Sequence, residues 1–128
     1  MPIQIEGLSV QDILALPFDE LAALVFIDRP IVINVGSAEV LGQFAVDQDS
    51  ITVELAQIDG GGEGILPALT KISRHVGKQA GVSEIRCIVH ALNCAKPNLK
   101  LRAHLIKTGF EIKEIPGKGE AYFKKIPL

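Results

Sequence analysis

The sequence predicts a mixed α/β (α+β) fold, in which a mostly antiparallel sheet carries helices on both faces. Segments of β-branched or alternating residues recur at 31–35, 40–46, 51–58 and 85–89. Stretches with apolar residues at helical spacing precede and follow the last of these segments. A strand, a helix and a strand in succession imply a parallel pair with a right-handed crossover, whereas tight turns between the other strands imply antiparallel pairs.

Length and composition predict one soluble domain over residues 1–128. The chain has 48% apolar and 22% charged residues and a formal charge of −2, which excludes a disordered chain and a strongly basic nucleic-acid footprint. Its 5% aromatic content also argues against base stacking on nucleic acid. The apolar run at 21–27 is much shorter than the roughly 20 residues of a membrane helix, and the start lacks a basic signal region. We expect a cytoplasmic protein without membrane association.

Two short helices are expected in the first thirty residues. Ser9 to Asp12 has the form of a capping box with Asp as its last residue. Pro17 suits the start of a second helix, and Asp19 and Glu20 suit the positive end of its dipole. The second helix should end at Arg29, because a residue before proline is pushed out of helical geometry.

An antiparallel meander should follow. Its first strand, 31–35, ends at Gly36-Ser37, and its second, 40–46, ends at the polar run Asp47–Ser50. The third, Ile51–Ile58, alternates apolar and polar residues as a half-buried strand does.

A glycine-rich segment, Asp59–Gly64, separates the meander from a long amphipathic helix. The apolar positions of that helix are Ile65, Leu69, Ile72, Val76 and Ala80. Gly81 should end it, and 85–89 should form a central strand. A further helix should run from Pro97 to Gly109 with Leu101, Leu105 and Ile106 toward the core, before two last strands at 110–115 and 120–126.

The glycine-rich segment has the setting of an anion site. A strand, a glycine-rich turn and a helix bring unpaired backbone N–H groups and the positive end of the helix dipole together. The segment lacks both the dinucleotide-fold and the P-loop glycine patterns. A tight strand-to-helix turn without a ligand remains the alternative interpretation.

Residues 98–110 sharpen this expectation, because Asn98 to Gly109-Phe110 resembles the closing helix and Gly-Phe of the GCN5-related N-acetyltransferases. Asp59–Gly64 is similar to that family's turn for the coenzyme A pyrophosphate, with Gly62 and Gly64 at its small positions. The resemblance covers about 51–110 and implies an acyl-CoA N-acyltransferase-like fold. It implies transfer of an acetyl or other acyl group from acyl-CoA, the small-molecule donor, to an amine that the sequence does not identify.

The resemblance also implies positions for the cofactor. The backbone near Leu55, Ala56 and Gln57 would pair with the pantetheine arm, and Asn98 would contact the cofactor. Divergence of the strands at 50–58 and 85–90 would open the cleft for acyl transfer. The N–H groups facing the pyrophosphate would be those of Gly60, Gly61, Gly62 and Gly64.

Three residues depart from the family pattern. Asp59 stands where Arg or Gln is usual, and Glu63 adds a second carboxylate beside it. A lost charge-assisted hydrogen bond costs about 1.5–3 kcal/mol, so these changes would weaken phosphate binding on the order of a hundredfold. Leu105 occupies the usual place of a tyrosine that protonates the leaving thiolate, and leucine cannot donate a proton.

Glu54 and Tyr122 are the candidate catalytic residues that could fill these gaps. Glu54 lies on the strand entering the glycine-rich segment and could deprotonate an amine, with an ordinary exposed strand position as the favoured alternative. Tyr122 could supply a proton from the last strand, with strand packing as the alternative. Basic residues of the long helix could attract phosphates or simply be solvated: Lys71, Arg74 and Lys78.

The main alternative function is a non-catalytic binding or assembly module with the same fold. We expect no metal site, because the spacing of Cys87, His90, Cys94 and His104 matches no zinc pattern. Cys87 should be a buried small apolar residue. The apolar run at 21–27 could serve a homodimer contact, with core packing as the ordinary interpretation.

Overall fold

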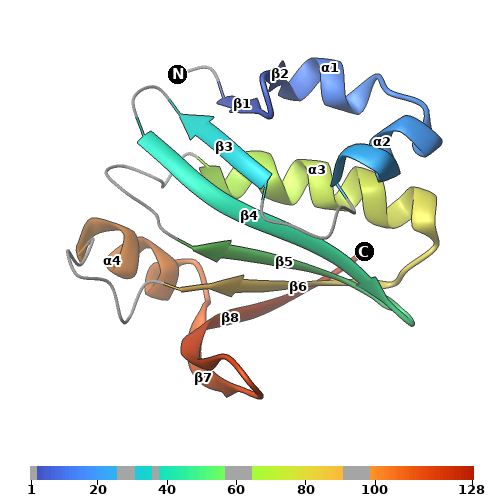
Figure 1. Ribbon diagram of the computed structural model, residues 1–128. Helices are drawn as coiled ribbons and strands as arrows, with labels where there is room; N and C mark the ends of the chain where they lie inside the picture. Colours follow the sequence, from blue (N-terminus) through green and yellow to red (C-terminus); the bar gives the residue numbers. More distant parts are fainter. Residues whose placement is uncertain (1–2, 26–30, 36–37, 57–64, 91–98) are drawn as a thin grey trace.

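The strands of the chain form one mixed sheet (Figure 1). The computed structural model describes residues 3–25, 31–35, 38–56, 65–90 and 99–128. Within these ranges the sheet has eight strands in the order β2-β1-β3-β4-β5-β6-β8-β7. They are β1 (Ile3–Ile5), β2 (Leu8–Ser9), β3 (Ile31–Val35), β4 (Ala38–Asp47), β5 (Ser50–Ala56), β6 (Glu84–Val89), β7 (Glu111–Ile115) and β8 (Gly119–Pro127).

One parallel pair lies at the centre of the sheet. β5 and β6 run parallel, with Ser50 opposite Glu84 and Leu55 opposite Val89. The other described neighbours are antiparallel, and β3, β4 and β5 form the expected meander. The prediction of a mixed, mostly antiparallel sheet is therefore confirmed.

Three of the described helices pack together, and the fourth lies across a pocket from one of them. α1 (Val10–Leu14) and α2 (Phe18–Val25) contact α3 (Ile65–Ala80), and α4 (Leu99–Lys107) lines the same pocket as α3. Among the described helices, none has the length and apolar character needed to cross a bilayer.

Several local signals form as the sequence predicts. The Ser9 side chain caps α1 by accepting a hydrogen bond from the Asp12 amide at 3.1 Å. Gly81 ends α3 with a φ of 78°, a left-handed conformation that suits glycine. Gly109 follows α4 with a φ of 99°, and the Phe110 amide bonds back to the Leu105 carbonyl at 2.9 Å.

Two further features were not expected. Residues 3–5 and 8–9 form a small antiparallel hairpin, whose turn has positive φ at both Glu6 and Gly7. Ile106, expected in the core, is 55% exposed, whereas its neighbour Leu105 is fully buried. The expected core helix face was therefore correct at Leu105 and wrong at Ile106.

Strand β5 shows how the two faces of the sheet differ. From Ile51 to Ala56 the odd-numbered residues are buried and the even-numbered ones are half-buried. The odd-numbered side faces the helices, because a Cβ built on Gly77 of α3 would lie 3.5 Å from Ile51 Cγ2. The even-numbered side belongs to the opposite face, which we call the open face.

Candidate functional site

A pocket of about 480 Å³ lies on the helix side of the sheet, between α3, α4 and the strands β5, β6 and β8. This volume is within the roughly 300–1,000 Å³ of small-molecule sites. The pocket is largely apolar because the alternating strands turn their hydrophobic residues to this side. Its apolar lining includes Val53, Leu55, Leu69, Cys87, Val89, Phe110 and Ile126.

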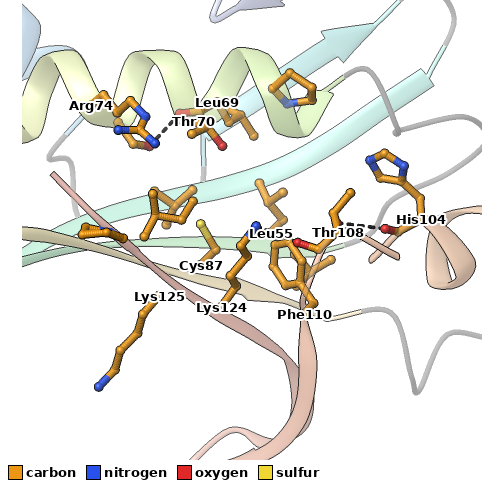
Figure 2. A pocket seen from close by; sticks show the side chains of 16 residues that line it. Leu55, Leu69, Thr70, Arg74, Cys87, His104, Thr108, Phe110, Lys124 and Lys125 are labelled. Carbon is orange, nitrogen blue, oxygen red and sulfur yellow. Dashed lines mark hydrogen bonds between the residues drawn. The ribbon is translucent and has the colours of Figure 1, made fainter. Parts of the chain in front are cut away.

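The polar part of the lining is basic. The described lining residues include no carboxylate, whereas four carry basic side chains: Arg74, His104, Lys124 and Lys125. Figure 2 shows Lys124 reaching toward Leu55 and Phe110, while the Lys125 side chain extends away from the other labelled residues. A ligand with an apolar part and an anionic group would complement this lining.

Lys124 is held in place on the pocket side of β8. Its Nζ donates a hydrogen bond to the backbone carbonyl of Thr108 at 2.6 Å. The same Nζ lies 5.8 Å from the centre of the Phe110 ring, within the range of a cation–π contact. These contacts place a cation beside the apolar lining, so an anionic group of a ligand would find its countercharge there.

Cys87 belongs to the apolar floor of the pocket. Its side chain is 8% exposed, and burial raises the pKa of the thiol to about 11, against the opposing effect of the Lys124 charge. The thiol is therefore protonated at neutral pH and is a poor nucleophile. This placement agrees with the expectation of Cys87 as a small apolar residue.

Three polar side chains meet on the open face, at the carboxyl ends of β5 and β6. Glu54 Oε2 lies 2.6 Å from His90 Nε2, and Glu54 Oε1 accepts a hydrogen bond from Lys118 Nζ. We call these three residues the Glu54 cluster. Lys118 comes from the turn between β7 and β8, so the cluster joins residues that lie up to 64 positions apart.

The cluster controls the charge of its carboxylate. Burial by itself would raise the pKa of Glu54, but the hydrogen bonds with Lys118 and His90 and the positive charge of Lys118 outweigh it and hold the pKa below its ordinary value of 4.5. Glu54 is thus ionised at neutral pH, with both oxygens engaged. Its side chain is 21% exposed, so an incoming group can still reach it.

The Glu54 cluster and the pocket adjoin one another across the sheet. Leu55 and Val89 line the pocket, whereas Glu54 and His90, their neighbours in the chain, turn to the open face. The His90 amide donates a hydrogen bond to the Leu55 carbonyl at 2.9 Å. Pairing of β5 with β6 is continuous up to this bond, so any divergence of the two strands begins beyond it.

The two candidate catalytic residues lie on opposite faces. Leu55, Val89 and Tyr122 stand side by side across β5, β6 and β8, so Tyr122 shares the helix-facing side, away from Glu54. Tyr122 is 4% exposed and packs in the core. The structure therefore does not bring Glu54 and Tyr122 together as one acid–base pair.

Most of the expected cofactor positions lie outside the described residues. These are Gln57, Gly60, Gly61, Gly62, Gly64 and Asn98, together with the acidic Asp59 and Glu63. Leu55 is described, and its carbonyl is engaged by His90, while Ala56 is half-buried at the end of β5. The roles given to these positions stay predictions.

Lys118, His90 and Lys124 were missed as site residues by sequence reasoning. Lys118 lies in a Pro-Gly-Lys-Gly turn, which indicates a hairpin but not the strand it reaches. His90 follows the central strand by one residue, a signal that its side chain lies at the carboxyl end of that strand. Among the residues described, no group of three or more His, Cys, Asp or Glu side chains is arranged to hold a metal ion.

No protein-family model and no curated protein matches the chain. Solved structures do match it. Ard1 from Thermoplasma volcanium aligns with a TM-score of 0.48 and 16% identity, over 100% of this chain and 99% of its own. The ribosomal-protein-S18-alanine N-acetyltransferase from Escherichia coli aligns at 0.45 and 18%, over 98% and 93%. The aminoglycoside acetyltransferase AAC(6')-Ib, solved with coenzyme A, aligns at 0.45 and 13%, over 77% and 65%.

Two of these three structures, the Escherichia coli protein and AAC(6')-Ib, are acetyltransferases by name, and the chain is similar to all three.

Proposed function

We propose that the chain binds an acyl-CoA in the pocket between α3 and α4 and transfers the acyl group to an amine at the Glu54 cluster. The single observation that supports this most is the pocket itself, which combines an apolar floor with basic side chains and a described lining free of carboxylates. A pantetheine arm with its acyl group suits the floor, and the phosphates of coenzyme A suit the basic residues. The residues that line the pocket therefore fit an acyl-CoA.

The residues that would hold the cofactor come from both sides of the pocket. Leu55, Leu69 and Val89 offer apolar contact, and Arg74 and Lys124 offer positive charge. When bound, an acyl-CoA supplies an acyl carbon that is activated as a thioester. Arg74 was already a candidate phosphate partner in the sequence, whereas Lys124 is added as an anion partner by its place in the pocket lining.

Glu54 and His90 would handle the proton of the acceptor. An amine that is to attack a carbonyl carbon must first lose a proton, and a positioned carboxylate or imidazole can take it. Glu54 is ionised and bonded to His90 at 2.6 Å, so the two groups can share the proton. Their position at the end of the β5–β6 pair, next to the pocket-lining Leu55, favours this role.

Calorimetric titration with acetyl-CoA and with coenzyme A tests the binding. Val53→Trp fills the floor of the pocket and should abolish the heat of binding. Thr52→Trp is the matched control, since it places the same ring on the open face of the same strand and should leave binding intact. Equal affinity in the wild type and Val53→Trp would remove the pocket from the proposal. If Gly62→Leu then abolished binding, the glycine-rich segment would be the site.

A non-catalytic binding module is the second candidate, and two observations favour it. Leu105 is fully buried and cannot donate a proton, and Tyr122 lies in the core on the face opposite Glu54. Release of free thiol from acetyl-CoA in the presence of a panel of amines separates the two candidates. Binding without thiol release would identify a binding module, whereas release that falls at least tenfold in Glu54→Gln would identify an acyltransferase.

A further inference from the structure

We propose that Lys118 is itself an acceptor, so that the chain acylates its own Lys118 side chain. The inference rests on the proposed binding of an acyl-CoA and names a modification site within the Glu54 cluster. Lys118 Nζ already occupies the position that an acceptor amine would need, on the Glu54 carboxylate at the carboxyl ends of β5 and β6.

The placement of Lys118 differs from that of the other lysines. Of the lysine side chains that the structure describes, Lys118 is the one whose amine lies on a carboxylate. Lys124 bonds to a backbone carbonyl on the helix side, and Lys113 Nζ lies 5.2 Å from the centre of the Phe123 ring. Lys118 is also 44% exposed, which leaves the amine accessible to an acyl group.

The geometry supplies both an acyl route and a proton acceptor. Leu55 lines the pocket and Glu54 precedes it in the chain, so the pocket and Lys118 are separated by the thickness of one sheet at the end of a strand pair. The last described bond between β5 and β6 joins His90 to Leu55, so the Glu54 cluster lies at the end of the described pairing of these strands. An acyl group that leaves the pocket past Leu55 would meet the Lys118 amine there.

The chemical step balances without another reactant. Lys118 Nζ gives one proton to the Glu54–His90 pair and attacks the thioester carbonyl carbon with its lone pair. A carbon–nitrogen bond forms and the carbon–sulfur bond breaks, with its electron pair leaving on sulfur. The sulfur is protonated by the proton that the Glu54–His90 pair received, and the nitrogen loses its second proton to solvent. The products are an Nζ-acyl-lysine and a free thiol.

Peptide mass mapping after incubation with acetyl-CoA tests the inference, with calorimetry on the same preparation to measure binding. Lys118 should gain an acetyl group at least tenfold faster than Lys125, an exposed lysine that carries no carboxylate contact. The rate constant at Lys118 should not depend on protein concentration, because the pocket that binds acetyl-CoA and the Lys118 acceptor belong to one molecule. Lys118→Arg should remove the modified peptide and leave the binding heat unchanged.

Two variants separate the cluster from simple exposure. Glu54→Gln and His90→Gln should each lower the rate at Lys118 at least tenfold and leave Lys125 unaffected, with circular dichroism to confirm folding. A small acetyl thioester without the coenzyme A moiety should modify both lysines at similar rates, since it does not bind the pocket. Binding of acetyl-CoA with equal rates at Lys118 and Lys125 would overturn the inference and leave the proposed function standing. Absence of binding, with equal slow rates, would overturn both.

Discussion

Replacing Glu54 with glutamine tests the energetics of the Glu54 cluster most directly. Glutamine keeps the shape of the side chain but loses the charge that holds Lys118 and His90. A hydrogen bond to a charged group contributes about 1.5–3 kcal/mol when protected, and an exposed ion pair about 0.2–1 kcal/mol. The three side chains are 21–44% exposed, so an intermediate loss is expected, about 1–2 kcal/mol in the free energy of unfolding.

Urea denaturation at pH 7 measures this loss as a lower midpoint, by about 0.5–1 M for an ordinary dependence on urea. Glu84→Gln is the matched control, because Glu84 pairs with Arg86 at 3.0 Å on the neighbouring strand but that pair is 31–45% exposed. It should cost less than about 0.5 kcal/mol.

The lowered pKa of Glu54 determines how its contribution to stability changes with pH. The folded-state pKa of Glu54 lies below its ordinary value of 4.5, so the carboxylate stabilises the fold above that pH, and the contribution is lost as the pH falls through the lower folded-state pKa. The difference between the wild type and Glu54→Gln should therefore be full at pH 7 and smaller at pH 3. An equal difference at both values would refute the electrostatic explanation, as would an unchanged loss when Lys118 is first replaced by methionine.

Two further predictions concern the sheet and the pocket. Gly42→Ala should lower the free energy of unfolding by about 1–3 kcal/mol in thermal or urea denaturation, because the new Cβ would lie 2.8 Å from Ile33 Cδ1 and 3.3 Å from Leu55 Cδ2, both in the packed core; unchanged stability would show that this core has room. In a Cys94→Ser background, alkylation of Cys87 at pH 8 should be about a hundredfold slower than for a thiol of pKa 9.0, and faster as the pH approaches 11, because the thiol pKa is raised to about 11. A rate at pH 8 equal to that of a small thiol would contradict the burial.

The fold could be predicted from the sequence wherever a pattern is local. Helical spacing from Ile65 to Ala80 gave α3 its observed bounds, and the glycines at 81 and 109 ended helices as expected. The β1–β2 hairpin was not predicted, because strands of three and two residues are too short to show the alternation of apolar and polar residues.

The residues of the candidate site likewise fall into those that a local pattern indicates and those that only the fold brings together. Glu54 could be singled out because it lies on a strand that enters a distinctive segment. Its partner Lys118 lies 64 residues further on, in a turn whose sequence specifies a hairpin but not what the hairpin reaches. The basic pocket lining likewise combines α3, α4 and β8, so Arg74 looked like a residue of a solvated helix face until the strands were ordered. The sequence patterns are local, so they could not predict contacts between residues that meet only when separate helices and strands pack together.

The alternation of residues along β5 has a consequence for how this domain can change over evolutionary time. Along β5, the residues that line the pocket alternate with those that face outward, so each residue contributes to only one of the two faces. A substitution at 52, 54 or 56 alters the outward surface and leaves the apolar lining intact, while one at 53 or 55 does the reverse. Substitutions that change the pocket lining and substitutions that change the open face can therefore accumulate independently on the same strand.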